Sequence, residues 1–412
     1  MATAGRSEPR GGGWRNVFAL GAVSFLTDLS TEMIYPLLPA FLSTVLGAPG
    51  VVLGAIEGAA ESVASLLKLA SGYYSDRMRG RKGLVFAGYL LSSAAKPLVA
   101  LATAPWHVAA VRLADRVGKG VRTAPRDSLL ADSVQPDQRG KAYGLQRTMD
   151  HAGAIAGPLV ASGLLAAGLL DLRGVFAAAA VPAAACVLCI LFLVRDAPRH
   201  ERAAAASQAA QRVALPPTFR PYILVVFLFT LGNSSDAFLL LRAGQLGVAP
   251  ALVPLVWVLL HVVKMVSSVP GGIVSDKIGR RATIVAGWIV YALVYAGLAM
   301  ASRAAHVWAL FAIYGLYFGL TEGVEKAYVA DLAPAEARGR AFGAFNCAVG
   351  IGALPASLLM GFLWDTHGAP VAFITGGALA LIAALLLVVA VRGAGAQGLA
   401  MDTVQSPSTL QK

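Results

Sequence analysis

Residues 72–82 read Gly-Tyr-Tyr-Ser-Asp-Arg-Met-Arg-Gly-Arg-Lys, a short run of glycine and charge between two long apolar segments. A related run at residues 272–281 reads Gly-Ile-Val-Ser-Asp-Lys-Ile-Gly-Arg-Arg. Asp76 and Asp276 are 200 positions apart, whereas Arg81 and Arg280 are 199 apart, so the first copy carries one extra residue.

A second pair of blocks repeats at the same interval. Residues 131–144 read Ala-Asp-Ser-Val-Gln-Pro-Asp-Gln-Arg-Gly-Lys-Ala-Tyr-Gly, and residues 330–343 read Ala-Asp-Leu-Ala-Pro-Ala-Glu-Ala-Arg-Gly-Arg-Ala-Phe-Gly. Self-similarity at a fixed interval indicates an internal repeat. The chain is therefore predicted to be two copies of one unit that meet near its middle.

The composition is that of a membrane protein. Of the 412 residues, 57% are hydrophobic and 14% are charged, and the mean hydropathy is +0.67. A water-soluble chain needs more charge to cover its surface. Residues 1–13 are glycine-rich and polar, and the first apolar run is long enough to span a bilayer, so no cleavable signal is expected.

The net charge of +12 does not indicate a nucleic-acid partner, because the basic residues lie in short loops between apolar runs. Three cysteines do not make a disulfide framework. Cys186 and Cys189 form a C-x-x-C pattern inside an apolar segment, where we expect core packing and neither redox nor metal chemistry.

Spanning a bilayer takes about 20 apolar residues, and only a helix satisfies its own backbone there. The sequence predicts twelve such helices in two pseudo-symmetric six-helix halves, an all-α membrane fold, at about residues 15–44, 51–74, 84–104, 107–132, 141–168, 173–194, 220–242, 251–274, 283–302, 307–331, 340–363 and 370–392. The corresponding domains are a cytoplasmic N-terminal tail, a first half, a cytoplasmic linker, a second half and a cytoplasmic C-terminal tail, at residues 1–14, 15–194, 195–219, 220–392 and 393–412.

Lys and Arg residues gather in alternate loops. They precede the first predicted helix, follow the second, fourth, eighth and tenth, and occupy the linker. The intervening loops are nearly free of them, with Arg173 and Arg303 as exceptions. The positive-inside rule predicts a multi-pass protein of a bacterial-type inner membrane with both termini in the cytoplasm.

These features resemble the major facilitator superfamily over nearly the whole chain. The family's signature after the second helix is G-x-x-x-D-R-x-G-R-[RK]. The first copy departs from it at Met78-Arg79, where one residue is usual, and the second copy keeps the family spacing. The resemblance implies a two-half transporter that works by alternating access. It also implies a cytoplasmic latch, for which the candidates are Gly72, Asp76, Arg77, Gly80, Arg81, Arg139, Gly272, Asp276, Gly279, Arg280 and Arg338.

The latch has a physical rationale. A helix C-terminus carries partial negative charge that favours Arg or Lys, and Gly72 allows close helix approach. Asp76 is predicted to pair with Arg139 of a neighbouring loop. The alternative is that these charges only anchor the loops at the membrane surface.

Ionisable groups inside the predicted helices are candidates for coupling or substrate binding, because they are costly in a membrane. Asp28 and Glu32 lie four residues apart and share one helix face. Two like charges so placed disfavour joint ionisation, which suits a proton carrier. Asp236 is their counterpart in the second half. Pairing with a basic residue as pure structure remains the alternative.

The fourth predicted helix carries a basic stripe of Arg112, Arg116 and Lys119. We expect the stripe to face the central cavity or the carboxylates of the first helix, since it cannot face lipid. Superfamily members often carry R-x-x-x-G-x-G here; Arg112 and Gly118 fit that motif, whereas Arg116 replaces its first glycine.

The tenth predicted helix carries charges of opposite sign, Glu322 and Glu325. Glu325 and Arg126 are related by the same interval of 199, so a charge pair between the halves is one hypothesis. Separate solvation in each cavity wall is the other.

The fifth predicted helix carries Gly144, Gly153, Gly157 and Pro158, a pattern similar to the antiporter motif of drug:proton exchangers. Ala161-Ser162 replaces the usual paired glycines. We expect the small residues to let this helix pack closely against its neighbour across the halves. Generic close packing with no bearing on transport direction is the alternative.

Together the features predict secondary active transport, and no Walker A loop is present that would bind ATP. No enzyme activity, metal or other cofactor is expected, because the sequence shows neither a metal-ligand cluster nor a nucleophile–base set. Proton-coupled antiport is favoured, with proton-coupled uptake of an organic anion or metal chelate as the alternative, and a non-transporting receptor or scaffold as the alternative outside transport. The expected partners of a monomer are protons, the lipid bilayer and a small substrate, anionic or zwitterionic unless Asp28 and Glu32 neutralise the stripe and admit cations.

Overall fold

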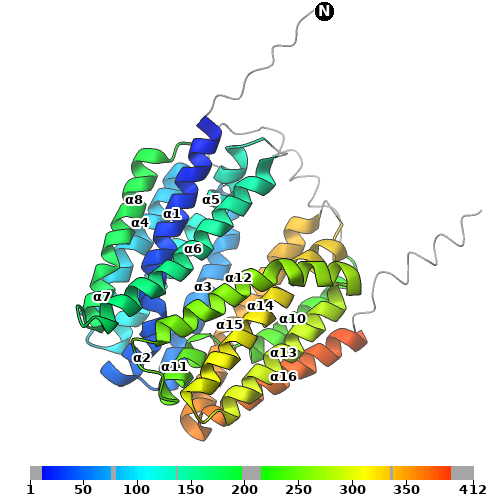
Figure 1. Cartoon of the computed structure of the whole chain (residues 1–412). Helices are drawn as coiled ribbons and strands as arrows, with labels where there is room; N and C mark the ends of the chain where they lie inside the picture. The colour runs from blue at the N-terminus through cyan, green and yellow to red at the C-terminus, as the bar shows by residue number, and fades with distance from the viewer. Residues whose placement is uncertain (1–11, 76–79, 136–137, 197–214, 335–336, 391–412) are drawn as a thin grey trace, which may run out of the picture.

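The structure is a computed structural model that describes residues 12–75, 80–135, 138–196, 215–334 and 337–390. Its described residues are helical throughout, with short connections (Figure 1). The predicted all-α fold class in two halves is therefore confirmed.

The first half consists of six helical rods, some of them built from consecutive short helices. Their bounds are Gly12–Ile34 (α1), continued by Tyr35–Leu37 (η1), Leu38–Ala40 (α2) and Phe41–Val45 (η2); Gly50–Ser75 (α3); Lys82–Ala95 (α4) with Lys96–Leu101 (η3); Pro105–Asp132 (α5); Arg139–Ala166 (α6); and Leu172–Ala178 (α7) with Ala180–Leu193 (α8).

The second half repeats this plan. Its bounds are Phe219–Gly232 (α10) with Ala237–Gln245 (α11), Val253–Ile278 (α12), Arg280–Met300 (α13), Ala304–Leu332 (α14), Arg338–His367 (α15) and Ala369–Ala390 (α16). Within the described ranges, ten helical segments are long and apolar enough to cross a membrane. The remaining two long helices, α5 and α6, have 28 residues each but carry more charge.

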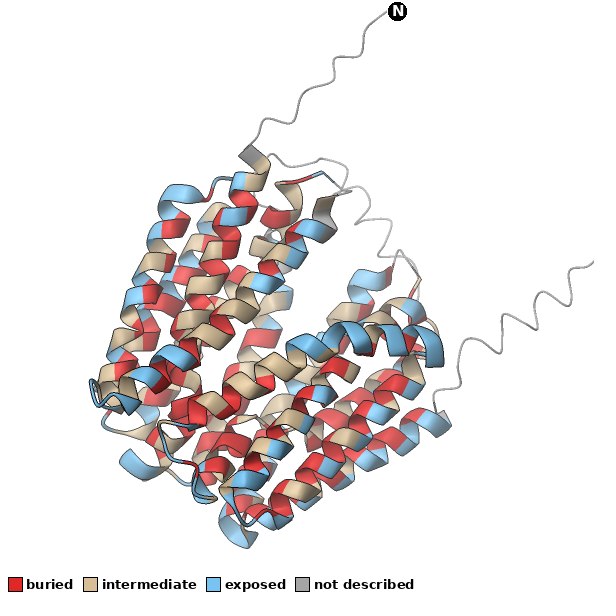
Figure 2. Cartoon of the chain, in the orientation of Figure 1, coloured by how far each residue is buried: buried red, intermediate tan, exposed pale blue. Residues whose placement is uncertain are grey.

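Side chains on the outer faces of the bundle are apolar. Figure 2 shows buried residues on helix faces that turn toward other helices and exposed residues on the outside, for example along α16. Large apolar side chains such as Phe192, Leu293 and Leu385 are exposed. A soluble protein rarely shows so much apolar surface, whereas lipid solvates it.

The two halves meet at one end and diverge at the other. In Figure 1 their ribbons approach near α2 and α11 and separate toward the end where α1 begins. At the closed end, the carboxylate of Asp365 accepts hydrogen bonds from the backbone N–H groups of Gly50 and Val51, both at 2.7 Å. The hydroxyl of Ser162 on α6 donates to the carbonyl oxygen of Ala251 at 2.6 Å.

Glycine is required where α3 crosses α15. A Cβ at Gly54 would collide with the carbonyl oxygen of Ser357, and one at Gly361 would lie 2.5 Å from the carbonyl oxygen of Gly50. Backbones can approach this closely only without side chains between them. The α3–α15 crossing therefore sets how tightly the halves close.

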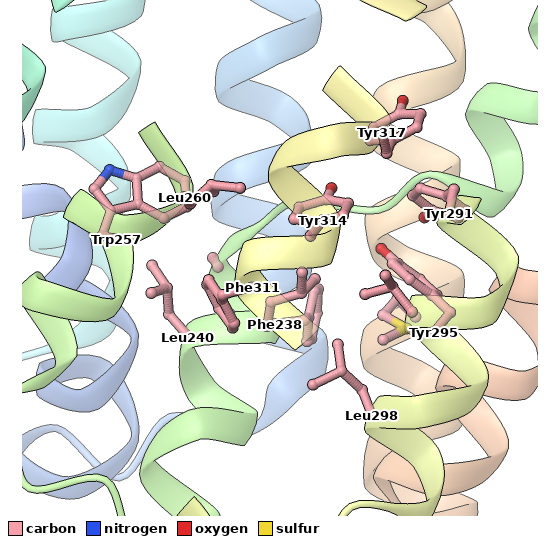
Figure 3. Packing of buried hydrophobic residues seen from close by; sticks show 14 of the residues in the cluster. Phe238, Leu240, Trp257, Leu260, Tyr291, Tyr295, Leu298, Phe311, Tyr314 and Tyr317 are labelled. Carbon is pink, nitrogen blue, oxygen red and sulfur yellow. The ribbon is translucent and has the colours of Figure 1, made fainter. Parts of the chain in front are cut away.

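The seventh predicted segment is two helices rather than one. The chain leaves helical geometry at Asn233 (φ −94°, ψ 80°), between α10 and α11. The Tyr291 hydroxyl donates to the carbonyl oxygen of Gly232 at 2.9 Å and replaces a lost helical bond. Four tyrosines, labelled with neighbouring core residues in Figure 3, surround the break: Tyr291, Tyr295, Tyr314 and Tyr317. Backbone groups freed inside a membrane need such protein partners.

Gly54→Ala is predicted to prevent closure at this crossing, because the added methyl group has no room against Ser357. A maleimide should then label a cysteine at Ser162, which is buried between α6 and the loop before α12, faster than it does in the parent. The labelling is measured in a background with Cys186, Cys189 and Cys347 replaced by Ser.

Gly163→Ala is the matched control, since a Cβ there meets no atom within 4 Å. Equal labelling rates in Gly54→Ala and Gly163→Ala would contradict the assignment of the crossing as the closing contact.

Candidate functional site

A cavity of about 420 Å³ lies between the halves. A second cavity of about 190 Å³, which we call the deep cavity, shares Asp28, Glu32, Lys119 and Arg122 with it. The deep cavity is lined from both halves by Asp28, Thr31, Glu32, Tyr35, Asp115, Arg116, Lys119, Arg122, Asp236 and Trp257. A third cavity of about 440 Å³ shares Arg147, His151, Lys264, Glu322 and Lys326 with the cavity of about 420 Å³. Among the described residues, no group of His, Cys, Asp and Glu could hold a metal ion.

Asp28 and Glu32 both line the deep cavity from α1. Glu32 reaches the other half, because its Oε2 accepts a hydrogen bond of 2.8 Å from the indole Nε1 of Trp257 on α12. The rings of Tyr35 and Trp257 also meet, with centroids 5.3 Å apart. A predicted coupling residue thus contributes to a contact that joins the halves.

Arg112 pairs with a different carboxylate from those considered for it. Its Nε and Nη2 donate to the two oxygens of Glu57 on α3 at 2.8 and 2.6 Å, and its Nη1 lies 3.7 Å from Asp115. Arg116 and Lys119 line the cavity, as expected of the basic stripe. Arg112 faces the second predicted helix, which is α3. Glu57, an acid inside an apolar helix, was the sequence signal for this partner.

The hypothetical pair between Arg126 and Glu325 is not formed in this structure. Arg126 binds Asp127 at 2.9 Å, and the indole of Trp288 on α13 donates to Glu325 at 2.9 Å within the second half. Glu322 pairs with Lys264 on α12 at 2.7 Å.

Asp236 lies at the break of the seventh rod and lines the deep cavity. Its Oδ1 accepts a hydrogen bond of 2.7 Å from the Tyr314 hydroxyl. Figure 3 shows Tyr314 on α14 beside the other tyrosines. Neither the break nor this partner had a signal in the spacing of the sequence.

The repeated loops bind the ends of neighbouring helices in equivalent ways. Arg280 pairs with Asp276 at 2.6 Å and with Asp331 at 3.3 Å, after Gly279 ends α12 with φ +93°. In the first half Arg81 pairs with Asp132, which the interval of 199 relates to Asp331. The repeat had already aligned these two aspartates, although their pairing was not predicted.

Other latch candidates are placed as follows. A Cβ at Gly80 would lie 2.7 Å from Asp196, and Nε of Arg338 donates to the carbonyl oxygen of Ala330 at 3.2 Å. Gly272 has open space around it, whereas Gly271 meets Gly319 too closely for a Cβ. The predicted pair of Asp76 with Arg139 and the role of Arg77 lie outside the described residues, as do the side chain of Arg139 and the surroundings of Gly72.

The Major Facilitator Superfamily model matches residues 20–263 and 223–399. The chain belongs to the major facilitator superfamily. This is a family of membrane transporters and not of enzymes, so the predicted transporter class is confirmed.

Individual relatives agree with this assignment. An uncharacterised MFS-type transporter of Methanocaldococcus jannaschii is 36% identical over 382 residues, which are 90% of this chain and 94% of that protein. The multidrug resistance protein MdtH of Salmonella newport is 24% identical over 347 residues, which are 83% of this chain and 85% of that protein. The solved nucleoside transporter NupG shares the fold with a TM-score of 0.74 at 14% identity, over 92% of this chain and 99% of its own.

The superfamily's antiporter-like glycines on α6 make a different contact from the predicted one. A Cβ at Gly153 would lie 2.5 Å from the carbonyl oxygen of Phe25, and one at Gly157 would lie 2.6 Å from that of Leu29. The expectation of packing across the halves is therefore wrong, because these glycines face α1 of the same half. Gly144 has no such neighbour, and Pro158 lies inside α6.

This α1–α6 contact supports the site. Gly157 would also place a Cβ 3.0 Å from that of Glu32, and Gly153 would do the same with Asp28. The two glycines therefore allow the backbone of α1 at Asp28 and Glu32 to pack directly against α6.

Glu57→Gln is predicted to destabilise the transporter by about 3 kcal/mol, since the buried Arg112 loses the ionised partner to which it donates two hydrogen bonds. The double substitution Glu57→Gln with Arg112→Gln should recover part of the loss. Thermal unfolding in detergent measures both, with the exposed Arg303→Gln as control. Equal stability of the single variant and the parent would contradict a structural role for the pair.

Trp257→Phe is predicted to weaken the closed end, because it removes the only N–H that the indole donates to Glu32 while keeping an aromatic ring. Labelling of a cysteine at Ser162 should accelerate relative to the parent. Trp106→Phe, which alters an exposed indole on α5, is the control; a rate in Trp257→Phe no higher than in this control would refute the link.

Proposed function

We propose that this transporter expels a small solute across a bacterial-type inner membrane in exchange for protons, acting as a monomer by alternating access. The observation that carries the proposal is the position of Asp28 and Glu32 in a cavity shared by both halves. A carboxylate there can hold either a proton or a positively charged group, but not both. Competition of this kind is what couples two opposed fluxes.

The orientation follows from charge. Lys and Arg in the loops at the diverging end are typical of the cytoplasmic side, and both termini lie on that side in the proposal. The cavity of this state then opens to the cytoplasm, and the contacts of Asp365 and Trp257 close it from the outside. In the opposite state, the repeated loops of residues 72–82 and 272–281 are proposed to latch the cytoplasmic ends.

Two further observations favour export. The α6 glycine pattern is similar to that of drug:proton exchangers, and a relative in Salmonella is a multidrug resistance protein. Neither identifies the solute.

Proton-coupled uptake of an organic anion is the second candidate. It is favoured by Arg116, Lys119 and Arg122, which line the same cavity. An anion would bind together with a proton, because protonation of Asp28 removes a neighbouring negative charge.

The test is a proteoliposome assay with an interior pH dye and pools of drugs, organic acids and metal chelates. Proton release from acid-loaded vesicles on external addition of a compound supports exchange. Proton entry together with the compound supports uptake instead, and a chain that moves neither protons nor solute from any pool would be a receptor or scaffold.

Asp28→Asn is predicted to reduce substrate-driven proton flux at least about tenfold, equivalent to about 1.4 kcal/mol, because an amide cannot carry the proton. Asp171→Asn is the matched control: Asp171 is exposed and caps α7, and Asn caps helices equally well. Unchanged flux in Asp28→Asn would exclude Asp28 as the coupling group.

A further inference from the structure

The basic residues of α5 fall into two groups. Arg112 and Arg126, toward its two ends, each bind a carboxylate. Arg116, Lys119 and Arg122 lie between them, and within the described part of the chain none of their side chains makes an ion pair or donates a hydrogen bond. We call these three residues the central basic cluster. The same helix thus carries cations that are paired within the protein and cations that have no carboxylate partner.

Two atoms of this cluster are buried without a hydrogen-bond partner. They are Nε of Arg116 and Nη1 of Arg122, and the two residues are 9% and 6% exposed. Arg122 is held in place by its guanidinium, which lies 4.4 Å from the centroid of the Tyr89 ring. A buried charged donor without an acceptor is unfavourable. Its position beside a cavity therefore indicates a ligand that supplies the acceptor.

Several carboxylates near the cluster accept their hydrogen bonds from other residues. Asp115 accepts hydrogen bonds from Ser92, Glu32 from Trp257 and Asp236 from Tyr314. Among the carboxylates that line the cavity of about 190 Å³, Asp28 accepts no hydrogen bond. Glu61 on α3 also faces Arg116 and Lys119, and Asp150 on α6 lines the adjoining cavity with a buried oxygen that has no hydrogen-bond partner. None of these described carboxylates lies within ion-pair distance of Arg116, Lys119 or Arg122, so the three cations have no protein acceptor in this state.

We propose that Arg116 and Arg122 form a subsite for an oxyanion group of the substrate, a carboxylate or a phosphate, with Lys119 between them. This proposal rests on the transport function proposed above and names the chemistry of its substrate. Asp28 remains opposite the subsite for a proton or for a cationic group on the same substrate.

The chemistry of the cluster suits such a group. A guanidinium presents several N–H donors in a planar fork, which matches the paired oxygens of a carboxylate or phosphate. The two arginines are separated by six residues, or roughly 9 Å of helix rise, so their long side chains can reach one oxyanion from two directions. The volume of about 190 Å³ holds a small organic acid.

The test measures binding of matched aromatic probes to purified full-length protein by isothermal titration calorimetry. Benzoate and phenyl phosphate carry the oxyanion, benzamide is the neutral analogue of benzoate, and benzylamine is the cationic one. We expect the anionic probes to bind at least about tenfold more tightly than benzamide. Whichever of the two anions binds more tightly identifies the oxyanion as carboxylate or phosphate.

Arg116→Gln and Arg122→Gln should each weaken anion binding about tenfold or more, and Arg116→Lys should restore part of it. Arg303→Gln, which removes an exposed charge outside the cavity, should leave it unchanged. Equal binding of benzoate and benzamide, preference for benzylamine, or no anion binding at millimolar concentration would each overturn the proposal.

Thermal unfolding without ligand gives an independent measurement. Removing a charge from a crowded, unpaired cluster should leave the protein at least as stable, so Arg116→Gln should unfold no earlier than the parent, in contrast to Arg112→Gln. If Arg116→Gln is as destabilised as Arg112→Gln, Arg116 has a structural partner and the subsite is wrong.

The two proposals fail in different ways. Binding in detergent requires no transport, so anion binding without flux would refute the transport mechanism and leave the subsite standing. Proton exchange driven by a purely cationic compound, with no anion binding, would refute the subsite and leave antiport standing.

Discussion

The free-energy cost of an ionised group in a bilayer is the constraint on which this structure depends. Asp28, Arg112 and Glu57 lie within helices that apolar surface surrounds, and each such charge needs a partner or an aqueous space. The fold provides both by placing the charged faces of α1, α5 and α6 toward the interior. The two most polar long helices, α5 and α6, are accordingly those that fall short of a membrane span in composition. The cavity and the architecture thus have a common origin.

The charges of α5 show how a buried arginine with a carboxylate partner differs from one without. Arg112 and Glu57 satisfy each other at two hydrogen bonds and are nearly inaccessible. Such a pair fixes α5 against α3 but offers nothing to a ligand. Arg116, one turn further along α5, is similarly buried, but its Nε has no hydrogen-bond partner. Sequence spacing treats the two arginines alike, and only the neighbouring helix separates their roles.

Much of the fold could be predicted because a bilayer permits few backbone solutions. The repeated loops at residues 72–82 and 272–281 revealed the two halves, and apolar run lengths located the rods. Helical periodicity also placed Asp28 and Glu32 on one face. It could not say which helix that face meets, since periodicity carries no information about neighbours. For this reason Glu57 was not matched with Arg112, and Gly153 and Gly157 were assigned to the wrong helix–helix contact. The break after Gly232 depends on tyrosines from α13 and α14, which are distant in the sequence.

The bond from Asp365 to the start of α3 has a consequence for the energy of opening. The carboxylate is exposed, and its donors are the first N–H groups of a helix, which have no partner within that helix. When the halves part at this end, water can replace the carboxylate at once, and no polar group is stranded in an apolar layer. Breaking these hydrogen bonds at the membrane–water boundary therefore costs little free energy. The same hydrogen bonds in the bilayer interior would be costly to break and would hold the protein in one state. In the alternating access proposed above, this position keeps the free-energy difference between the two conformations small.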